Sequence, residues 1–117
     1  MGDLDELTDL VRRFVDERDW CRFHNAKDLA SAISIEASEL QEIFLWKERE
    51  EAEGIMADPD SRREVEEEMA DILIYLLSMA SAYRVDLKEA VARKVASNSR
   101  KYPADAVRGK AVKYDRL

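Results

Sequence analysis

The sequence contains few of the residues that build turns and disulfides. Its 117 residues include only three Gly, two Pro and one Cys. So little Gly and Pro argues against an all-β fold, which needs many tight turns. The single Cys21 excludes an internal disulfide framework and favours a reducing, cytoplasmic environment.

Long apolar runs and an excess of positive charge are also missing. The longest apolar run, residues 72–77, is far shorter than the ~20 residues that span a bilayer. The N-terminal residues 1–6 are acidic and contain no apolar signal-peptide core. The net charge of −7 opposes general binding to nucleic acids, which favour basic surfaces. We therefore expect a cytoplasmic protein with neither a membrane nor a nucleic acid as a partner.

Helical periodicity dominates the rest of the chain. Hydrophobic residues make up 46% and charged residues 38% of the sequence, which is typical of a helix-rich globular protein. Apolar spacing and capping residues predict helices over residues 4–18, 26–48, 61–83 and 87–102. The acidic segment 49–60, with Gly54 and Pro59, is expected to be a surface loop. Short links between the helices predict an all-α, four-helix-bundle-like protomer with antiparallel neighbours.

One helical domain over residues 1–103 accounts for most of the length. Residues 104–117 are locally basic and are expected to form a loosely ordered tail. The third predicted helix is apolar on every face, because Leu73, Ile74 and Leu77 lie beside its main apolar stripe. Since one small chain cannot cover such a helix on all sides, we expect a homodimer or a homotetramer built as a dimer of dimers.

Two short acidic motifs, Glu36-Ala-Ser-Glu39 and Glu68-Met-Ala-Asp71, stand in apolar helical surroundings. Residues three apart share one face of a helix, so each motif presents two carboxylates together. Glu36 occupies a position in the apolar stripe of its helix, and Asp71 is flanked by apolar residues. An ionised carboxylate in such surroundings costs roughly several kcal/mol unless a positive group neutralises it. The four carboxylates therefore predict a site for a divalent cation.

Oxygen ligands favour Mg²⁺ at this site, with Mn²⁺ as a substitute. Mg²⁺ prefers carboxylates, waters and substrate phosphates in octahedral geometry. Neither motif contains a histidine, which argues against zinc and against a ferritin-like di-iron site. Glu-x-x-Glu is also common on solvated helices, so either motif alone would indicate only an exposed surface. Two motifs on separate helices in apolar surroundings favour a metal site that acts on phosphates.

Further residues extend the acidic motifs into a longer ordered pattern: RDWCRFH at 18–24, FLWK at 44–47, DILIY at 71–75, RVDL at 84–87 and KYP at 101–103. Together these segments resemble the MazG-like, all-α nucleoside triphosphate pyrophosphohydrolases, nearest the dCTP pyrophosphatase branch. The similarity runs in order from Phe14 to Pro103. It implies Mg²⁺-dependent attack of water on a nucleoside triphosphate, giving the monophosphate and pyrophosphate. It also implies a site built across neighbouring subunits.

The same resemblance assigns roles to single residues. The four acidic residues, Glu36, Glu39, Glu68 and Asp71, would hold the metal, and one of the glutamates would orient or deprotonate the attacking water. Seven further residues match positions near the substrate: Trp20, His24, Trp46, Tyr75, Lys94, Asn98 and Tyr102. The tryptophans would enclose the base, and because every base can stack, selection must come from hydrogen bonds to the base edge. Lys94 and Asn98 are four residues apart on one predicted helix, so they could serve one ligand.

The pattern as a whole predicts a pyrophosphohydrolase of dCTP or a modified deoxycytidine triphosphate that removes unwanted DNA precursors. Two alternatives stay open. One is the same reaction on another triphosphate, such as dUTP, dTTP or a damaged purine nucleotide. The other is a non-catalytic helical oligomer that binds a nucleotide or a metal as a sensor. The presence of all four acidic residues and of Lys94 favours the enzyme.

Overall fold

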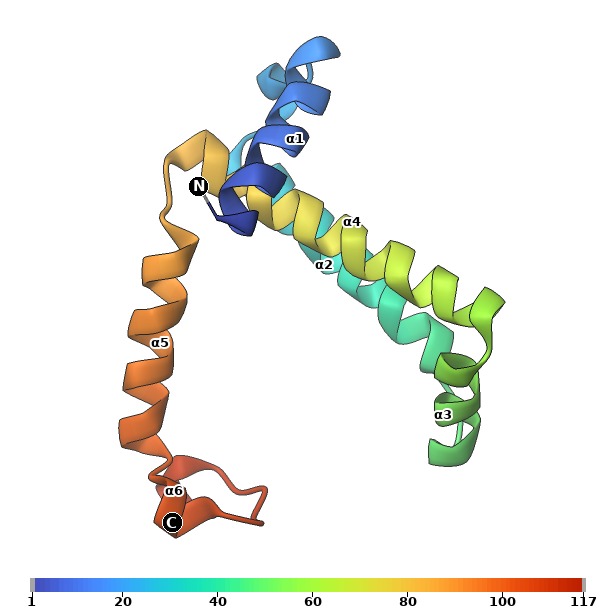
Figure 1. Cartoon of the computed structure of the whole chain (residues 1–117), viewed down its shortest axis with the longest axis vertical. Helices are drawn as coiled ribbons and strands as arrows, with labels where there is room; N and C mark the ends of the chain where they lie inside the picture. The colour runs from blue at the N-terminus through green and yellow to red at the C-terminus, as the bar shows by residue number, and fades with distance from the viewer. Residues whose placement is uncertain (1, 117) are drawn as a thin grey trace. The chain divides into compact units, whose positions relative to one another are not determined.

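The computed structural model describes residues 2–116, which are helices joined by short turns (Figure 1). No β-strand occurs within these residues, so the all-α prediction is confirmed. The chain divides into two compact units, Met1–Arg84 and Val85–Leu117. No helix in the described part is long and apolar enough to cross a bilayer.

The first unit contains four α-helices and one 3₁₀ turn: α1 (Asp3–Glu17), η1 (Cys21–Phe23), α2 (Ala26–Phe44), α3 (Arg49–Ala57) and α4 (Pro59–Tyr83). Two of these helices begin at side chains that cap them. The Asn25 side chain accepts a hydrogen bond from the Asp28 backbone N–H at 2.9 Å, at the start of α2. The Asp58 side chain accepts from the Ser61 backbone N–H at 3.1 Å, at the start of α4. Such caps satisfy backbone donors that have no partner inside the helix.

The helix α3 lies where we predicted a loop, so that prediction was wrong. Glu, Ala, Ile and Met favour helix, and the single Gly54 does not outweigh them. The backbone N–H of Glu48 donates to the Glu51 side chain at 3.3 Å, which supports the first turn of α3. Pro59 then occupies the first position of α4, where its missing N–H is not needed.

The helix α2 is shorter than predicted, because it ends at Phe44 rather than near Glu48. Trp46 has a φ of 62°, in the left-handed region that a continuing helix cannot use. The chain therefore turns between α2 and α3. This turn places Trp46 at the end of the α2–α4 pair.

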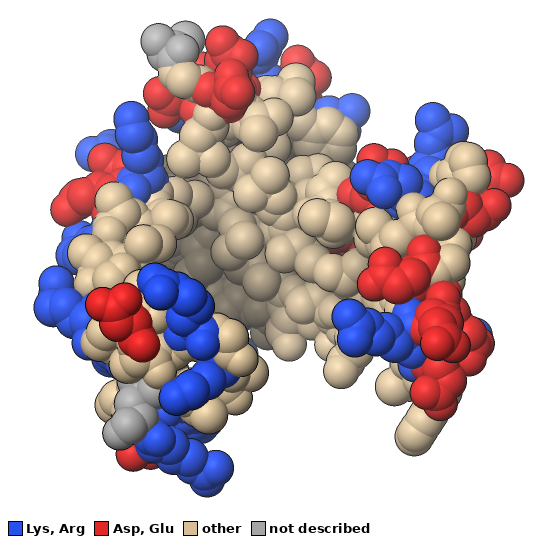
Figure 2. All heavy atoms as spheres, turned by 60° about the horizontal axis from the view of Figure 1, so that its bottom comes forward, with Lys and Arg blue, Asp and Glu red and all other residues tan. Residues whose placement is uncertain are grey.

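The antiparallel helices α2 and α4 run side by side, and α1 and α3 also pack on α4 (Figure 1). The predicted antiparallel packing is confirmed. The buried apolar side chains are few: Val15, Leu29, Val65, Leu77 and Ala80. Large apolar residues stay exposed, among them Leu10 at 58%. Figure 2 shows that uncharged side chains gather on one face of this first unit.

The second unit contains α5 (Leu87–Lys101), α6 (Ala104–Val107) and η2 (Tyr114–Arg116). The Asp86 side chain accepts from the Glu89 backbone N–H at 3.0 Å, which confirms the predicted start of α5. No residue of α5 is buried. The rings of Tyr102 and Tyr114 meet edge to face at 6.2 Å between centroids, so the end of α5 contacts the following segment. The single domain over 1–103 and the loosely ordered tail stay predictions.

Candidate metal centre

The acidic motifs lie on the two helices that pack most closely, α2 and α4. Glu36 and Glu39 are one turn apart on α2, and Glu68 projects from α4. One carboxylate oxygen from each of these three residues lies within 4.8 Å of the others. Oxygen ligands around Mg²⁺ or Ca²⁺ are separated by at most about 4–5 Å, because metal–oxygen distances are about 2.0–2.6 Å. The three carboxylates are therefore close enough to bind one cation together.

Two oxygens of this cluster have no hydrogen-bond partner. Glu36 Oε2 and Glu68 Oε2 are buried, and no donor among the described residues reaches them. A buried carboxylate oxygen without a partner is unfavourable, because it has lost water and gained nothing in exchange. A cation would supply the missing interaction for both oxygens. The donor set, composed of carboxylates alone, fits a hard divalent metal ion.

The electrostatics of the cluster also favour a cation. Burial raises the pKa of Glu36 to about 7, and the neighbouring carboxylates of Glu39 and Asp71 add to the rise. Burial also raises the pKa of Glu68, followed by the charge of Glu39. Like charges at this distance cannot all ionise without a penalty, so a proton shared within the cluster relieves the repulsion near neutral pH. A divalent cation would take the place of that proton.

Asp71 lies one turn after Glu68 on α4 and is half-buried. It is outside the group of three carboxylates whose oxygens converge within 4.8 Å. Its negative charge nevertheless raises the pKa of both Glu36 and Glu68, so it lies beside the cluster. Tyr75 follows one turn later on the same face of α4 and is also half-buried.

The predicted base-binding residues of the first unit lie around its two turns. Trp20 precedes η1 and packs edge to face on Phe14, with 5.6 Å between ring centroids. His24 ends η1 and is half-buried. Trp46 is 91% exposed, and its backbone has the left-handed conformation described above. Strain of this kind in a bulky residue commonly marks a functional position.

The remaining predicted residues, Lys94, Asn98 and Tyr102, belong to the second unit. Lys94 and Asn98 are exposed and one turn apart on α5, so both can reach one ligand. Tyr102 is the C-cap of α5 and is half-buried against Tyr114.

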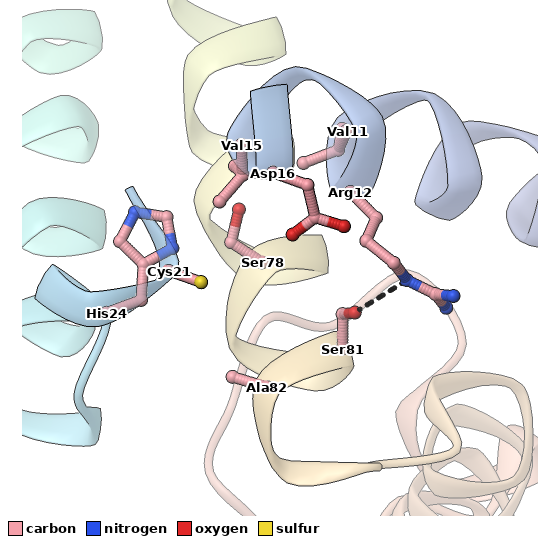
Figure 3. A pocket seen from close by; sticks show the side chains of 9 residues that line it. All are labelled: Val11, Arg12, Val15, Asp16, Cys21, His24, Ser78, Ser81 and Ala82. Atoms are coloured by element: carbon pink, nitrogen blue, oxygen red, sulfur yellow. Dashed lines mark hydrogen bonds between the residues drawn. The ribbon is translucent and has the colours of Figure 1, made fainter. Parts of the chain in front are cut away.

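A small pocket that the sequence did not predict lies between α1, η1 and the C-terminal half of α4 (Figure 3). Its volume is about 70 Å³. The polar residues that line it are Arg12, Asp16, Cys21, His24, Ser78 and Ser81. One signal was visible in the sequence, because Ser78 interrupts an apolar run at a spacing that puts it on the helix face of Asp71. The packing of α1 against that face is not visible in the sequence.

Comparison with known proteins gives this geometry a context. The chain matches the MazG-like family over residues 31–117, a segment that includes both acidic motifs. It is 42% identical over 114 residues to dCTP pyrophosphatase 1 from Bos taurus, which covers 97% of this chain and 68% of that protein. The Homo sapiens protein of the same name is 40% identical, with coverage of 97% and 67%.

A solved structure supports the same relationship. The crystal structure of a pyrophosphatase from Archaeoglobus fulgidus is similar with a TM-score of 0.81 at 43% identity. The match covers 88% of this chain and 94% of the archaeal chain. From the family match over most of the chain and from these relatives, we conclude that the chain belongs to the MazG-like family.

Proposed function

We propose that this protein is a Mg²⁺-dependent nucleoside triphosphate pyrophosphohydrolase. It converts dCTP, or a modified deoxycytidine triphosphate, to the monophosphate and pyrophosphate, and so removes unwanted DNA precursors in the cytoplasm. The observation that carries the proposal is the convergence of Glu36, Glu39 and Glu68, with two buried oxygens that lack partners. The relatives that are named dCTP pyrophosphatase 1 support the reaction and the base.

The three converging glutamates would hold the metal, with Asp71 beside them as the fourth acidic residue. Bound Mg²⁺ would supply positive charge to the phosphate oxygens and lower the pKa of a water molecule, and Mn²⁺ can replace it. One of the glutamates would orient the attacking water or accept its proton. A carboxylate held against its neighbours by packed helices can do so without a large movement.

The other residues would bind the substrate. Lys94 carries a compact positive charge suited to a phosphate, and Asn98 can both donate and accept hydrogen bonds on the same face of α5. Trp20 and Trp46 would stack on the base, with His24 near it. Tyr75 would contact the sugar, since it lies one turn beyond Asp71. Tyr102, at the end of α5, completes the set of residues proposed to contact the substrate.

We also propose that the working form is a homodimer or a homotetramer. An apolar groove of about 460 Å³ runs between α1 and α4 and is lined by Leu7, Leu10, Val11, Phe14, Ala70, Leu73, Ile74 and Leu77. Contiguous exposed apolar surface of this kind is typical of an interface. A second copy of the chain would cover it. Association between copies would also bring groups of one copy to the site of another.

The test is an assay of pyrophosphate release over a panel of natural and modified (d)NTPs, with Mg²⁺ or with EDTA, in which the nucleotide product is identified. We expect Mg²⁺-dependent formation of the monophosphate and pyrophosphate, fastest with a deoxycytidine triphosphate. Glu39→Gln should abolish turnover, whereas Glu42→Gln, on the same helix but outside the cluster, should retain it. A folded protein that hydrolyses no triphosphate would refute the proposal and favour a sensor. Turnover that is fastest with another base would refute only the preference for cytosine.

A further inference from the structure

Ser78 is the buried polar side chain of α4, with 7% of its surface exposed. Its hydroxyl has no hydrogen-bond partner among the described residues. Several other helical hydroxyls do have one. Thr8 and Ser38 donate to backbone carbonyls four residues earlier, at 2.7 and 2.9 Å. A buried hydroxyl normally has such a partner, so the Ser78 hydroxyl is free to form a hydrogen bond with a group from outside the chain.

The Ser78 hydroxyl faces the pocket between α1, η1 and α4. Figure 3 shows the Asp16 carboxylate turned toward the same space from α1, and the Cys21 thiol directed at it from η1. The Asp16 side chain takes part in no hydrogen bond or salt bridge within residues 2–116. Arg12, by contrast, is engaged, because its Nε donates to the Ser81 hydroxyl at 3.4 Å. The pocket therefore presents one free carboxylate and one free hydroxyl.

The pocket lies on the face of α4 that carries the metal centre. Glu68, Asp71, Tyr75 and Ser78 follow one another at steps of three and four residues, which places them in one row along the helix. Ser78 is about 10 Å beyond Asp71 along the helix axis, at 1.5 Å per residue. A nucleotide whose phosphates bind at the acidic cluster and whose sugar lies near Tyr75 would bring its base to this pocket.

We propose that this pocket receives the edge of the base, and that Asp16 and Ser78 select a pyrimidine that carries an exocyclic amino group. The inference rests on the proposed function, because it needs the phosphates at the acidic cluster. An ionised carboxylate can only accept hydrogen bonds, so Asp16 pairs with the amino group of cytosine. The Ser78 hydroxyl donates to the neighbouring ring nitrogen. Uracil and thymine present a carbonyl oxygen to Asp16 instead, and two acceptors repel each other.

The size of the pocket supports a single ring. The pocket has a volume of about 70 Å³. A pyrimidine has one ring and a purine has two, so a pocket of this size suits the smaller base better. The apolar side chains Val11, Val15 and Ala82 complete the lining. Ser78 is buried in it, whereas Asp16 is exposed, so a base that enters would contact both groups. Base selection then depends on the two free polar groups.

Asp16→Asn tests the proposal directly, because asparagine keeps the shape of the side chain but offers an amide N–H donor. We expect the ratio of kcat/KM for dCTP to that for dUTP to fall about tenfold or more, as for one lost charged hydrogen bond. Asp5→Asn removes the same charge from an exposed position of α1 outside the pocket and should leave the ratio unchanged. A wild-type protein that hydrolyses no triphosphate would refute the proposed function. An active wild type, together with an unchanged ratio in Asp16→Asn, would overturn only the role of the pocket.

Ser78→Ala provides a second variant. It removes a hydroxyl that has no partner in the chain, so the melting temperature should not fall. The KM for dCTP should rise severalfold while that for dUTP changes less. Equal changes for both nucleotides would contradict base recognition by Ser78.

Cys21 allows a test that does not depend on turnover. It is the only cysteine, it is exposed and it lines the pocket. At concentrations of dCMP that inhibit dCTP hydrolysis by half or more, the alkylation of Cys21 by iodoacetamide should slow severalfold. An unchanged rate of alkylation at such concentrations would show that the base binds elsewhere and would overturn the proposal.

Discussion

The substitution Glu36→Gln is expected to stabilise the metal-free protein and to remove its stabilisation by Mg²⁺. In the wild type, burial and the neighbouring carboxylates raise the pKa of Glu36 to about 7, and one of its oxygens is buried without a partner. Glutamine keeps the size of the side chain but carries no charge, so it relieves the repulsion from Glu39 and Asp71. The same change removes one carboxylate from the proposed metal site. Glu36→Gln should therefore raise the stability of the metal-free protein and lower the stability that Mg²⁺ adds.

The magnitude follows from the pKa of Glu36. Because this pKa rises from 4.5 in the unfolded chain to about 7, the folded protein holds a proton more tightly. The resulting stability is fully present below about pH 4.5 and is lost as the pH rises through about 7. The unscreened shift corresponds to roughly 3 kcal/mol, and partial exposure to solvent reduces it to about 1–2 kcal/mol. In a domain of this size that is about 5–10 °C in Tm.

The assay is thermal unfolding at about pH 5.5 and about pH 8, with EDTA or with excess Mg²⁺, at one protein concentration. In EDTA, the Tm of the wild type should fall between the two pH values and that of Glu36→Gln should fall much less. Mg²⁺ should stabilise the wild type most at the higher pH, where it displaces no proton. At one hundred times its Kd this gain is about 2.7 kcal/mol. Equal pH dependence in both proteins would refute the raised pKa of Glu36, and an equal gain from Mg²⁺ would refute its place in the metal site.

Three further substitutions test the remaining proposals. Asp71→Asn should abolish hydrolysis and leave the circular dichroism spectrum unchanged, and retained turnover would exclude Asp71 from the metal site. Trp46→Ala should raise KM severalfold with a smaller loss in kcat, because stacking on the base is worth about 1–3 kcal/mol; an unchanged KM would assign the indole to packing between subunits. Leu10→Lys places a charge in the α1–α4 groove and should shift the mass measured by light scattering toward the monomer. Glu6→Gln, on the same helix but outside the groove, changes the net charge by the same one unit and is the matched control. The same mass for both variants would contradict the interface.

The features that sequence predicted correctly depend on neighbours along the chain. The cap at Asp86 and the i, i+3 spacing of Glu36 and Glu39 depend on residues close together in the sequence. The sequence alone therefore predicts both the start of α5 and the pair of carboxylates on α2. The loop prediction over residues 49–60 was wrong for a local reason as well. One glycine, Gly54, destabilises a helix less than the helix-favouring residues around it stabilise one.

The features that sequence could not predict depend on packing between distant segments. The spacing within each acidic motif indicated two pairs of carboxylates, but only the packing of α2 against α4 brings Glu68 to Glu36 and Glu39. The pocket between α1, η1 and α4 depends even more on packing between distant segments. Asp16 has no unusual neighbours in the sequence, and its carboxylate lines the pocket only because α1 packs on α4.

The two kinds of unpartnered polar group in this structure call for different ligands. Glu36 Oε2 and Glu68 Oε2 are acceptors within a cluster of negative charge, so only a cation or a proton satisfies them. The Ser78 hydroxyl can donate or accept and stands opposite a free carboxylate, so a neutral molecule with both donors and acceptors satisfies it. A nucleotide with its bound metal ion meets both demands, because its phosphates bind the cation and its base carries the neutral polar edge. One ligand along one face of α4 would therefore account for all three unpartnered atoms.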